Sequence, residues 1–298
     1  MRRRILGLGL VVLLGSTTAS AGGAITGGFV DVPLGDLAKL VEQVHGITIR
    51  APAYVARREV TVKAEGLSAV DFVKLVAEQA GATIESHDAK TFTLVDDWRG
   101  RVERGLQKAA GFKLEEASLA KALAAVEAAT GVPVVLDAGS PDILGESVAQ
   151  LQVESIPGSD ILALICSFTD TAWESRWGVV FVTPRPRLTD LPADAITPAA
   201  DPEAPEAAQA TRRRILDGVL AKSLEGGSAA EAITALGAAT GLKLLVTEAA
   251  REKAAKAGPV RLPASLSLEH ALTLLLAPAG LAYEIGPEGE IRVIPAKK

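Results

Sequence analysis

The chain has very few of the residues that carry redox, metal or nucleophilic chemistry. Its 298 residues include one cysteine, Cys166, and three histidines, His45, His87 and His270. A single cysteine excludes an intramolecular disulfide, so apolar cores must hold the fold together. The histidines are far apart, and none has a second ligand at helix or turn spacing. The sequence therefore predicts no metal site and no cofactor.

The sequence also lacks an apolar run long enough to cross a membrane as a helix, which takes about 20 residues. The apolar run at residues 5–14 is shorter than that, follows three arginines at positions 2–4, and precedes an Ala-Ser-Ala site at positions 19–21. This three-part pattern is typical of a secretory signal peptide. We expect residues 1–21 to be removed and the mature chain, without a transmembrane segment, to be periplasmic, with secretion as the alternative.

A positively charged surface is missing as well. The formal net charge of -5 becomes -8 once the three arginines of the expected signal peptide are removed. Nucleic-acid binding requires clustered cations. The remaining arginine cluster, residues 212–214, follows an acidic stretch at residues 201–206, and the two are expected to neutralise each other. The sequence predicts no nucleic-acid partner.

The dominant positive feature is a unit of roughly 70 residues that occurs three times. Each copy has an amphipathic helix that ends at a glycine and runs directly into an apolar strand, at residues 34–50, 118–137 and 228–246. Around these segments the pattern predicts strand, helix, strand, strand, helix and strand. The predicted fold class is α+β, with three repeated small modules, each packing two helices on small mixed sheets.

The repeats divide the chain into expected domains. After the signal peptide, residues 27–97 form the first module and residues 98–184 the second, which begins with a connector helix. Residues 212–298 form the third module, also with a leading connector helix. Between the last two modules, residues 185–211 are rich in Pro, Ala and acidic residues and show no apolar period. Such a composition predicts a flexible linker.

The junctions between helix and strand carry a family resemblance. Residues 129–135 read ATGVPVV and residues 239–245 read ATGLKLL, the latter followed by a Leu-rich helix and strand up to residue 283. Together with the order of elements, these segments resemble the short N-terminal domain shared by bacterial secretins and TonB-dependent signal-transducing receptors. The resemblance implies periplasmic protein contacts, either in ring assembly beneath an outer-membrane channel or in signal transfer to an inner-membrane partner.

One segment matches a catalytic pattern. Ser118 and Lys121 have the Ser-x-x-Lys spacing of penicillin-binding enzymes, in which the lysine can activate the serine. The Lys-Thr-Gly strand of that family is absent, and the repeats align Ser118 with Ser228 and Pro33. All three residues suit the start of a helix, so we expect Ser118 to be an N-cap. No catalytic residue is predicted, and the chain is not expected to be an enzyme.

Two other candidates also have structural explanations. Cys166 aligns with Val76 and Leu275 on the apolar face of the second helix, which predicts a buried core residue. Asp96 and Asp97 are acidic neighbours at a strand end, where a solvated turn is expected in preference to a cation site.

Trp173 and Trp177 flank a short turn in the second module. Two indoles on one side of a hairpin can anchor a protein interface. Cross-strand packing inside a small sheet accounts for them equally well. The sequence leaves both interpretations open.

The expected function follows from the export signal, the repeats and the resemblance. We expect a non-enzymatic periplasmic interaction or scaffold protein, accessory to a secretion or envelope assembly, that binds a protein partner through exposed edge strands or helix faces. A signal-transfer module, and a binder of an envelope polymer or small ligand, are the alternatives. Self-association is left open.

Overall fold

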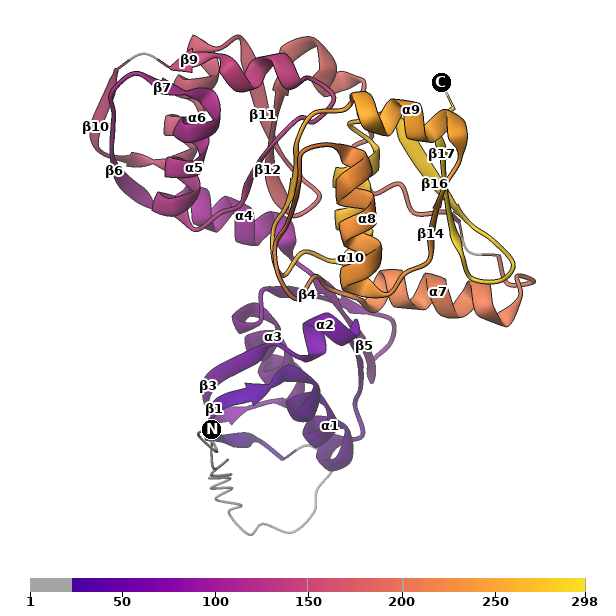
Figure 1. Cartoon of the computed structure of the whole chain (residues 1–298). Coiled ribbons are helices and arrows are strands. Elements are labelled where there is room, and N and C mark those ends of the chain that lie inside the picture. The colour runs from indigo at the N-terminus through magenta and orange to yellow at the C-terminus, as the bar shows by residue number, and fades with distance from the viewer. Residues whose placement is uncertain (1–22, 149, 200, 298) are drawn as a thin grey trace, which may run out of the picture. The chain divides into compact units, whose positions relative to one another are not determined.

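The computed structural model describes residues 23–148, 150–199 and 201–297, and the expected signal peptide lies outside these ranges. The chain divides into two compact units, one that ends at Asp97 and one that begins at Trp98 (Figure 1). No helix in the described residues is long and apolar enough to span a membrane.

Unit 1 contains one module with two small sheets and one core. Its elements are β1 (Ile25–Pro33), α1 (Leu34–His45), β2 (Thr48–Arg50), α2 (Ala53–Ala56), β3 (Glu59–Leu67), α3 (Ala69–Gln79), β4 (Ala82–Ser86) and β5 (Thr91–Asp96). β1 pairs with β3 in antiparallel fashion, and the other sheet has the order β2-β5-β4. The parallel pair β2/β5 and the antiparallel pair β4/β5 make this second sheet mixed. The apolar faces of α1 and α3 meet both sheets in one hydrophobic core.

Unit 2 contains the second and third modules, and both repeat this topology. The second consists of α4 (Trp98–Leu106), β6 (Ala109–Leu114), β7 (Ala117–Ser118), α5 (Leu119–Thr130), β8 (Val134–Leu136), β9 (Ser147–Val148), β10 (Leu151–Pro157), α6 (Gly158–Phe168), β11 (Thr171–Arg176) and β12 (Val179–Pro184). Its sheets are β6/β10, the short pair β7/β9, and the mixed sheet β11-β12-β8.

The third module consists of α7 (Glu206–Asp217), β13 (Leu224–Gly226), α8 (Ala229–Thr240), β14 (Leu244–Val246), α9 (Glu248–Lys256), β15 (Val260–Leu262), α10 (Leu268–Leu276), β16 (Leu281–Ile285) and β17 (Ile291–Pro295). Its sheets are β13/β15 and the mixed sheet β14-β17-β16. In every module the strand after the glycine-ended helix (β2, β8 or β14) runs parallel to the last strand (β5, β12 or β17). The predicted α+β class of small modules with mixed sheets is confirmed.

The glycines at the helix ends explain why the same motif recurs. Gly46, Gly131 and Gly241 have φ values of 64°, 71° and 66°, and each backbone N–H bonds the carbonyl four residues earlier. This left-handed conformation is readily adopted by glycine and strained for other residues. The helix therefore stops at the glycine, and the chain turns into the strand that joins the mixed sheet.

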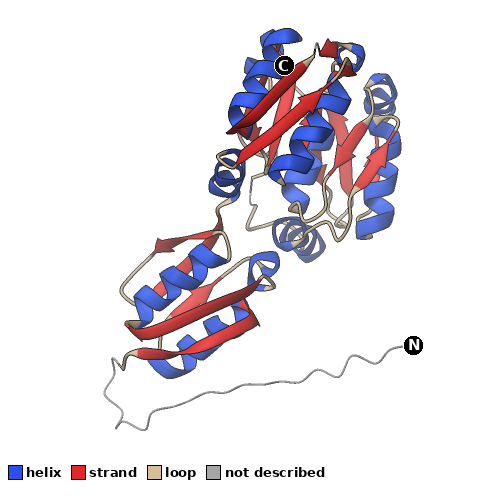
Figure 2. Ribbon diagram, turned by 90° about the vertical axis from the view of Figure 1, so that its left-hand side faces the viewer, coloured by secondary structure: helices blue, strands red, loops and turns tan. Residues whose placement is uncertain are grey.

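The central strand β12 shows how the two modules of unit 2 are joined. Val180 and Val182 face the core of the second module, whereas Val179 and Phe181 belong to a core that consists mainly of third-module residues. All four side chains are fully buried. A strand covered on both faces is a near-continuous apolar run, and helices and sheets alternate in layers across unit 2 (Figure 2).

The region between these modules differs from the expected flexible linker. A 3-10 turn (Arg185–Thr189) follows β12 directly, Leu191 is buried, and α7 begins at Glu206, inside the range predicted as linker. We call residues 185–199 the strap, because they contact both modules as described below. The segment was predicted to be flexible because its sequence lacks an apolar period. Hydrogen bonds to its backbone carbonyls hold the strap, and amino-acid composition does not reveal such bonds.

Candidate interaction surfaces

The second and third modules meet through a bidentate ion pair. Arg261, on β15, donates hydrogen bonds from Nη1 and Nη2 to the two carboxylate oxygens of Glu127, on α5, at 2.6 and 2.8 Å. Glu127 Oε2 also accepts the backbone N–H of Val134 at 3.2 Å. The bond to Glu127 raises the pKa of Arg261 above its ordinary value. The two parallel hydrogen bonds hold the modules together, and their geometry also sets how the two modules are positioned against each other.

A second polar contact lies at the end of β8. The carboxylate of Asp137 has no exposed surface and accepts hydrogen bonds from Thr183 Oγ1 at 2.6 Å and Arg187 Nε at 2.7 Å. Arg187 Nη2 donates in turn to the carbonyl oxygen of Pro278, in the third module, at 3.0 Å. A buried carboxylate is tolerated when it is paired and hydrogen-bonded in this way. Asp137 thus couples the second module, the strap and the third module.

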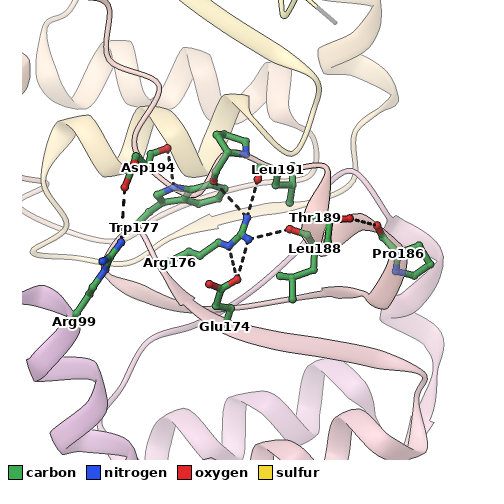
Figure 3. A network of polar contacts seen from close by, with 10 residues as sticks. Arg99, Glu174, Arg176, Trp177, Pro186, Leu188, Thr189, Leu191 and Asp194 are labelled. Atoms are coloured by element: carbon green, nitrogen blue, oxygen red, sulfur yellow. Dashed lines mark hydrogen bonds and ion pairs between the residues drawn. The ribbon is translucent and has the colours of Figure 1, made fainter.

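The strap is fastened to the second module by Arg176 and Trp177, at the β11–β12 turn (Figure 3). Arg176 donates from Nη2 to the carbonyl of Leu188 at 2.9 Å and from Nη1 to that of Leu191 at 3.0 Å. The Trp177 indole N–H donates to the carbonyl of Asp194 at 3.2 Å. These side chains supply hydrogen-bond donors to strap carbonyls that have no partner in a helix or sheet. The bonds keep the strap against the second module.

The other half of the strap is fastened to the third module. The backbone N–H of Ile196 donates to Thr273 Oγ1 at 3.1 Å, and Thr197 Oγ1 donates to Glu269 Oε1 at 2.5 Å. Tyr283 Oη donates to Thr197 Oγ1 at 3.5 Å. Burial raises the pKa of Tyr283 to about 12. The strap therefore holds the two modules together instead of separating them.

The predicted tryptophan pair does not lie on one face of the hairpin. Trp177 is 1% exposed and packs against Phe181, with ring centroids 5.4 Å apart, in the core shared with the third module. Trp173 is half-buried and packs against the core of the second module. Trp177 is thus an anchor between two modules of one chain, and the anchoring of an outside partner by this pair stays a prediction. The backbone φ of 50° at Trp177 directs it into the shared core, which strand alternation alone does not predict.

The residues considered for chemistry lie apart from one another. Ser118 is the N-cap of α5, and its Oγ accepts the backbone N–H of Lys121 at 3.4 Å, in agreement with the capping prediction. His45 lies in the last turn of α1, and His87 Nε2 is 2.8 Å from Thr93 Oγ1. His270, on α10, packs edge-on against Trp98. Among the described residues, no group of three or more His, Cys, Asp or Glu could hold a metal ion.

Cys166 is 3% exposed, as expected, and burial raises the pKa of its thiol. Counting from the helix N-caps, however, aligns it with Ala77 and Leu276, one residue later than the sequence alignment. Asp96 is not the solvated turn residue that was predicted. Its side chain is only 10% exposed and forms an ion pair with Arg58 Nη2 at 2.9 Å.

Unit 1 presents a sheet edge at β4. The hydrogen bonds His87 N–H to Thr91 O and Asp97 N–H to Gly81 O mark the bonded pairs of the β4/β5 ladder. Because bonded and non-bonded pairs alternate in an antiparallel ladder, the backbone groups at positions 82, 84 and 86 point away from β5. β4 is the outermost strand of its sheet. Ala82 is buried, so the strand offers the outward donors and acceptors of Ile84 and Ser86 to an added strand.

The equivalent strands of the other modules have an extra neighbour. α4 contacts β11, and α7 contacts β16, so each leading helix packs beside the corresponding strand of its own module. In the described part of unit 1 the first element is β1, and no helix takes this place. In the described residues, β4 therefore has no leading helix of its own module beside it.

Comparisons with known proteins identify no relative. No protein-family model, no curated protein and no solved structure matches the chain.

Proposed function

We propose that the chain is an exported, non-enzymatic interaction protein of the bacterial cell envelope, built from modules of the secretin and TonB short N-terminal type. It acts in the periplasm as a scaffold or accessory to a secretion or envelope assembly. The observation that carries this proposal is the open edge of β4 in unit 1. A partner protein adds a strand there, and its backbone bonds to the outward groups at positions 84 and 86.

The arrangement of the chain supports a division of labour between the units. The second and third modules bind each other through Arg261, Asp137 and the strap, so the faces in contact are already occupied. Unit 1 is a separate compact body with its own core. Such a body is suited to engage a partner while unit 2 serves as a rigid spacer.

The test uses a proline at an outward-facing position of β4. Ser86→Pro removes a backbone N–H that points away from β5, so the ladder within unit 1 keeps its bonds. Ser86→Ala is the matched control, because it removes the hydroxyl and keeps that N–H. We expect the wild-type chain and Ser86→Ala to retain the same protein from an envelope extract, and Ser86→Pro to lose it. The circular dichroism spectra of all three should agree.

Hydrogen exchange then locates the contact. With the identified partner bound, the amides of Ile84 and Ser86 should exchange more slowly, while amides on the far side of unit 1 should not change. Retention of the partner by Ser86→Pro, or protection confined to unit 2, would refute strand addition at β4. If no protein is retained by the wild-type chain, the interaction proposal itself fails.

A further inference from the structure

The outer strand of the hairpin that closes each module carries a glutamate at one shared position. Each of these strands follows a residue with a positive φ, at 63°, 47° and 67° for Gly81, Asp170 and Gly280. The fourth residue after each of them is a glutamate: Glu85 on β4, Glu174 on β11 and Glu284 on β16. All three glutamates are exposed.

These glutamates lie on the sheet face that points away from the core of their own module. The residue before each glutamate packs against that core or lies in it, and these residues are Ile84, Trp173 and Tyr283. Because side chains alternate along a strand, the glutamate next in sequence faces the opposite way. The three modules therefore place a carboxylate at the same point of the outer sheet face.

In both modules of unit 2, an arginine of the same module accompanies this carboxylate. Glu174 Oε2 accepts a hydrogen bond from Arg176 Nε at 2.8 Å (Figure 3). Glu284 lies directly opposite Arg292 in the β16/β17 ladder. Opposite charges at neighbouring positions of a sheet face stabilise the pairing of its strands. The shared position is thus one where a glutamate has a cation beside it.

Unit 1 has the glutamate without the arginine. Glu85 lies opposite Thr93 in the β4/β5 ladder. His87 takes the sequence position of Arg176, two residues after the glutamate, and its Nε2 lies 2.8 Å from Thr93 Oγ1. Arg50 pairs with Thr93 from β2, on the far side of β5. None of the ion pairs in the described part of unit 1 includes Glu85. Its carboxylate is therefore available to a cation from outside the unit.

Glu85 also has a special place on the open edge, because it lies between the two outward-pointing positions, Ile84 and Ser86. A strand added antiparallel to β4 forms hydrogen-bonded pairs at these two positions and a non-bonded pair at Glu85. The side chains of a non-bonded pair are the closer ones, with Cα atoms about 4.5 Å apart instead of about 5.5 Å. The added residue opposite Glu85 therefore lies directly beside the carboxylate.

We propose that the strand added at β4 has a lysine or arginine opposite Glu85, with an apolar residue on each side of it. The proposal rests on the proposed function and names the chemistry of the partner. The partner's cation takes the part that Arg176 has beside Glu174. The flanking apolar side chains face the same way as Ile84, which is half-buried and packs against the core. The partner segment therefore alternates apolar and basic residues.

Titration of the isotope-labelled mature chain with two capped peptides tests this pairing by nuclear magnetic resonance. One peptide is Gly-Thr-Val-Lys-Val-Thr-Gly, and the other has glutamate in place of the central lysine. The amide signals of Ile84 and Ser86 report binding at the edge. We expect the lysine peptide to shift both signals and to bind about fivefold more tightly than the glutamate peptide. High salt should reduce this difference, because the pair is exposed and screened.

Glu85→Lys should reverse the preference between the two peptides. Glu59→Lys is the matched control, because Glu59 is also exposed but lies on β3, in the other sheet of unit 1, and this variant should keep the wild-type preference. Circular dichroism spectra that match the wild type show that both variants are folded.

The outcomes separate this inference from strand addition itself. Equal affinities for the two peptides, or a preference that Glu85→Lys leaves unchanged, would overturn the basic residue opposite Glu85 and leave strand addition in place. If neither peptide shifts the amide signals of Ile84 and Ser86 up to its solubility limit, strand addition at β4 is refuted, and the inference falls with it.

Discussion

Arg261 and Glu127, 134 positions apart in the sequence, form a bidentate pair with bonds of 2.6 and 2.8 Å. The pair joins the third module to the second, and it is partly open to water, with side-chain exposures of 41% and 23%. Its contribution to stability is therefore closer to that of a surface pair than to that of a buried one.

A double-mutant cycle with Arg261→Gln and Glu127→Gln should give a coupling energy of about 1 kcal/mol, on the scale of a well-oriented, partly exposed pair. All three tryptophans, Trp98, Trp173 and Trp177, are in unit 2, so their fluorescence in urea follows the unfolding of that unit alone. Additive effects of the two substitutions would show that the pair does not hold the modules together.

Trp177→Ala should destabilise unit 2 by about 3 to 5 kcal/mol, because it empties the largest fully buried side-chain site and frees the carbonyl of Asp194. Trp173→Ala, at a half-buried position, should cost clearly less. Urea unfolding followed by circular dichroism measures both. Equal costs would mean that Trp177 is not the principal anchor between the modules.

Arg176→Met should release the strap. The substitution removes the donors to the carbonyls of Leu188 and Leu191, so the bond after Arg187 should become a faster site for trypsin. Arg185→Met is the control, because Arg185 has the same charge but pairs at the surface with Asp170. Mass spectrometry of the digests identifies the cut. Cleavage at the wild-type rate in Arg176→Met would show that other contacts suffice to hold the strap.

Tyr283 makes stability depend on pH in alkaline solution. Its pKa is about 12 in the folded chain and 10.0 as the reference value for the unfolded chain. The contribution of the neutral phenol is complete below pH 10 and is lost between pH 10 and 12, because only the unfolded state ionises there. A shift of two units corresponds to about 2 to 3 kcal/mol. The difference in unfolding free energy between the wild type and Tyr283→Phe should therefore change by that amount between pH 9 and pH 12, and a constant difference would contradict the burial argument.

Cys166 should be unreactive in the folded chain. The thiol is buried and its pKa is raised, and both effects lower the concentration of accessible thiolate. Labelling with a thiol-specific disulfide reagent should be at least about 100-fold slower in buffer than in urea, since an opening free energy of about 2.8 kcal/mol already gives that factor. Because Cys166 is the only cysteine, the labelling rate reports on this residue alone. Rapid labelling of the native chain would place it at a reactive surface instead.

Periodicity and chain-reversing residues made most secondary-structure elements predictable. The Leu-rich helix expected before residue 283 is α10, and its first turn is capped by Ser267. α2 and α9 were missed, since four residues are too few for a helical period and the polar face of α9 hides its two buried alanines. Residues 179–182 are four successive apolar residues, which is typical of a strand buried on both faces, and this pattern could have revealed the shared core but was not used.

The sequence by itself determined the three-fold repeat, the positions where helices stop, and the order of helices and strands, because these depend on residues close together along the chain. Only the tertiary structure decided which surfaces are covered. Trp177 is buried, Leu245 is exposed, and the Pro-rich strap is fixed by carbonyl groups that every residue has. Those outcomes depend on contacts between residues tens of positions apart, and local composition does not specify such contacts.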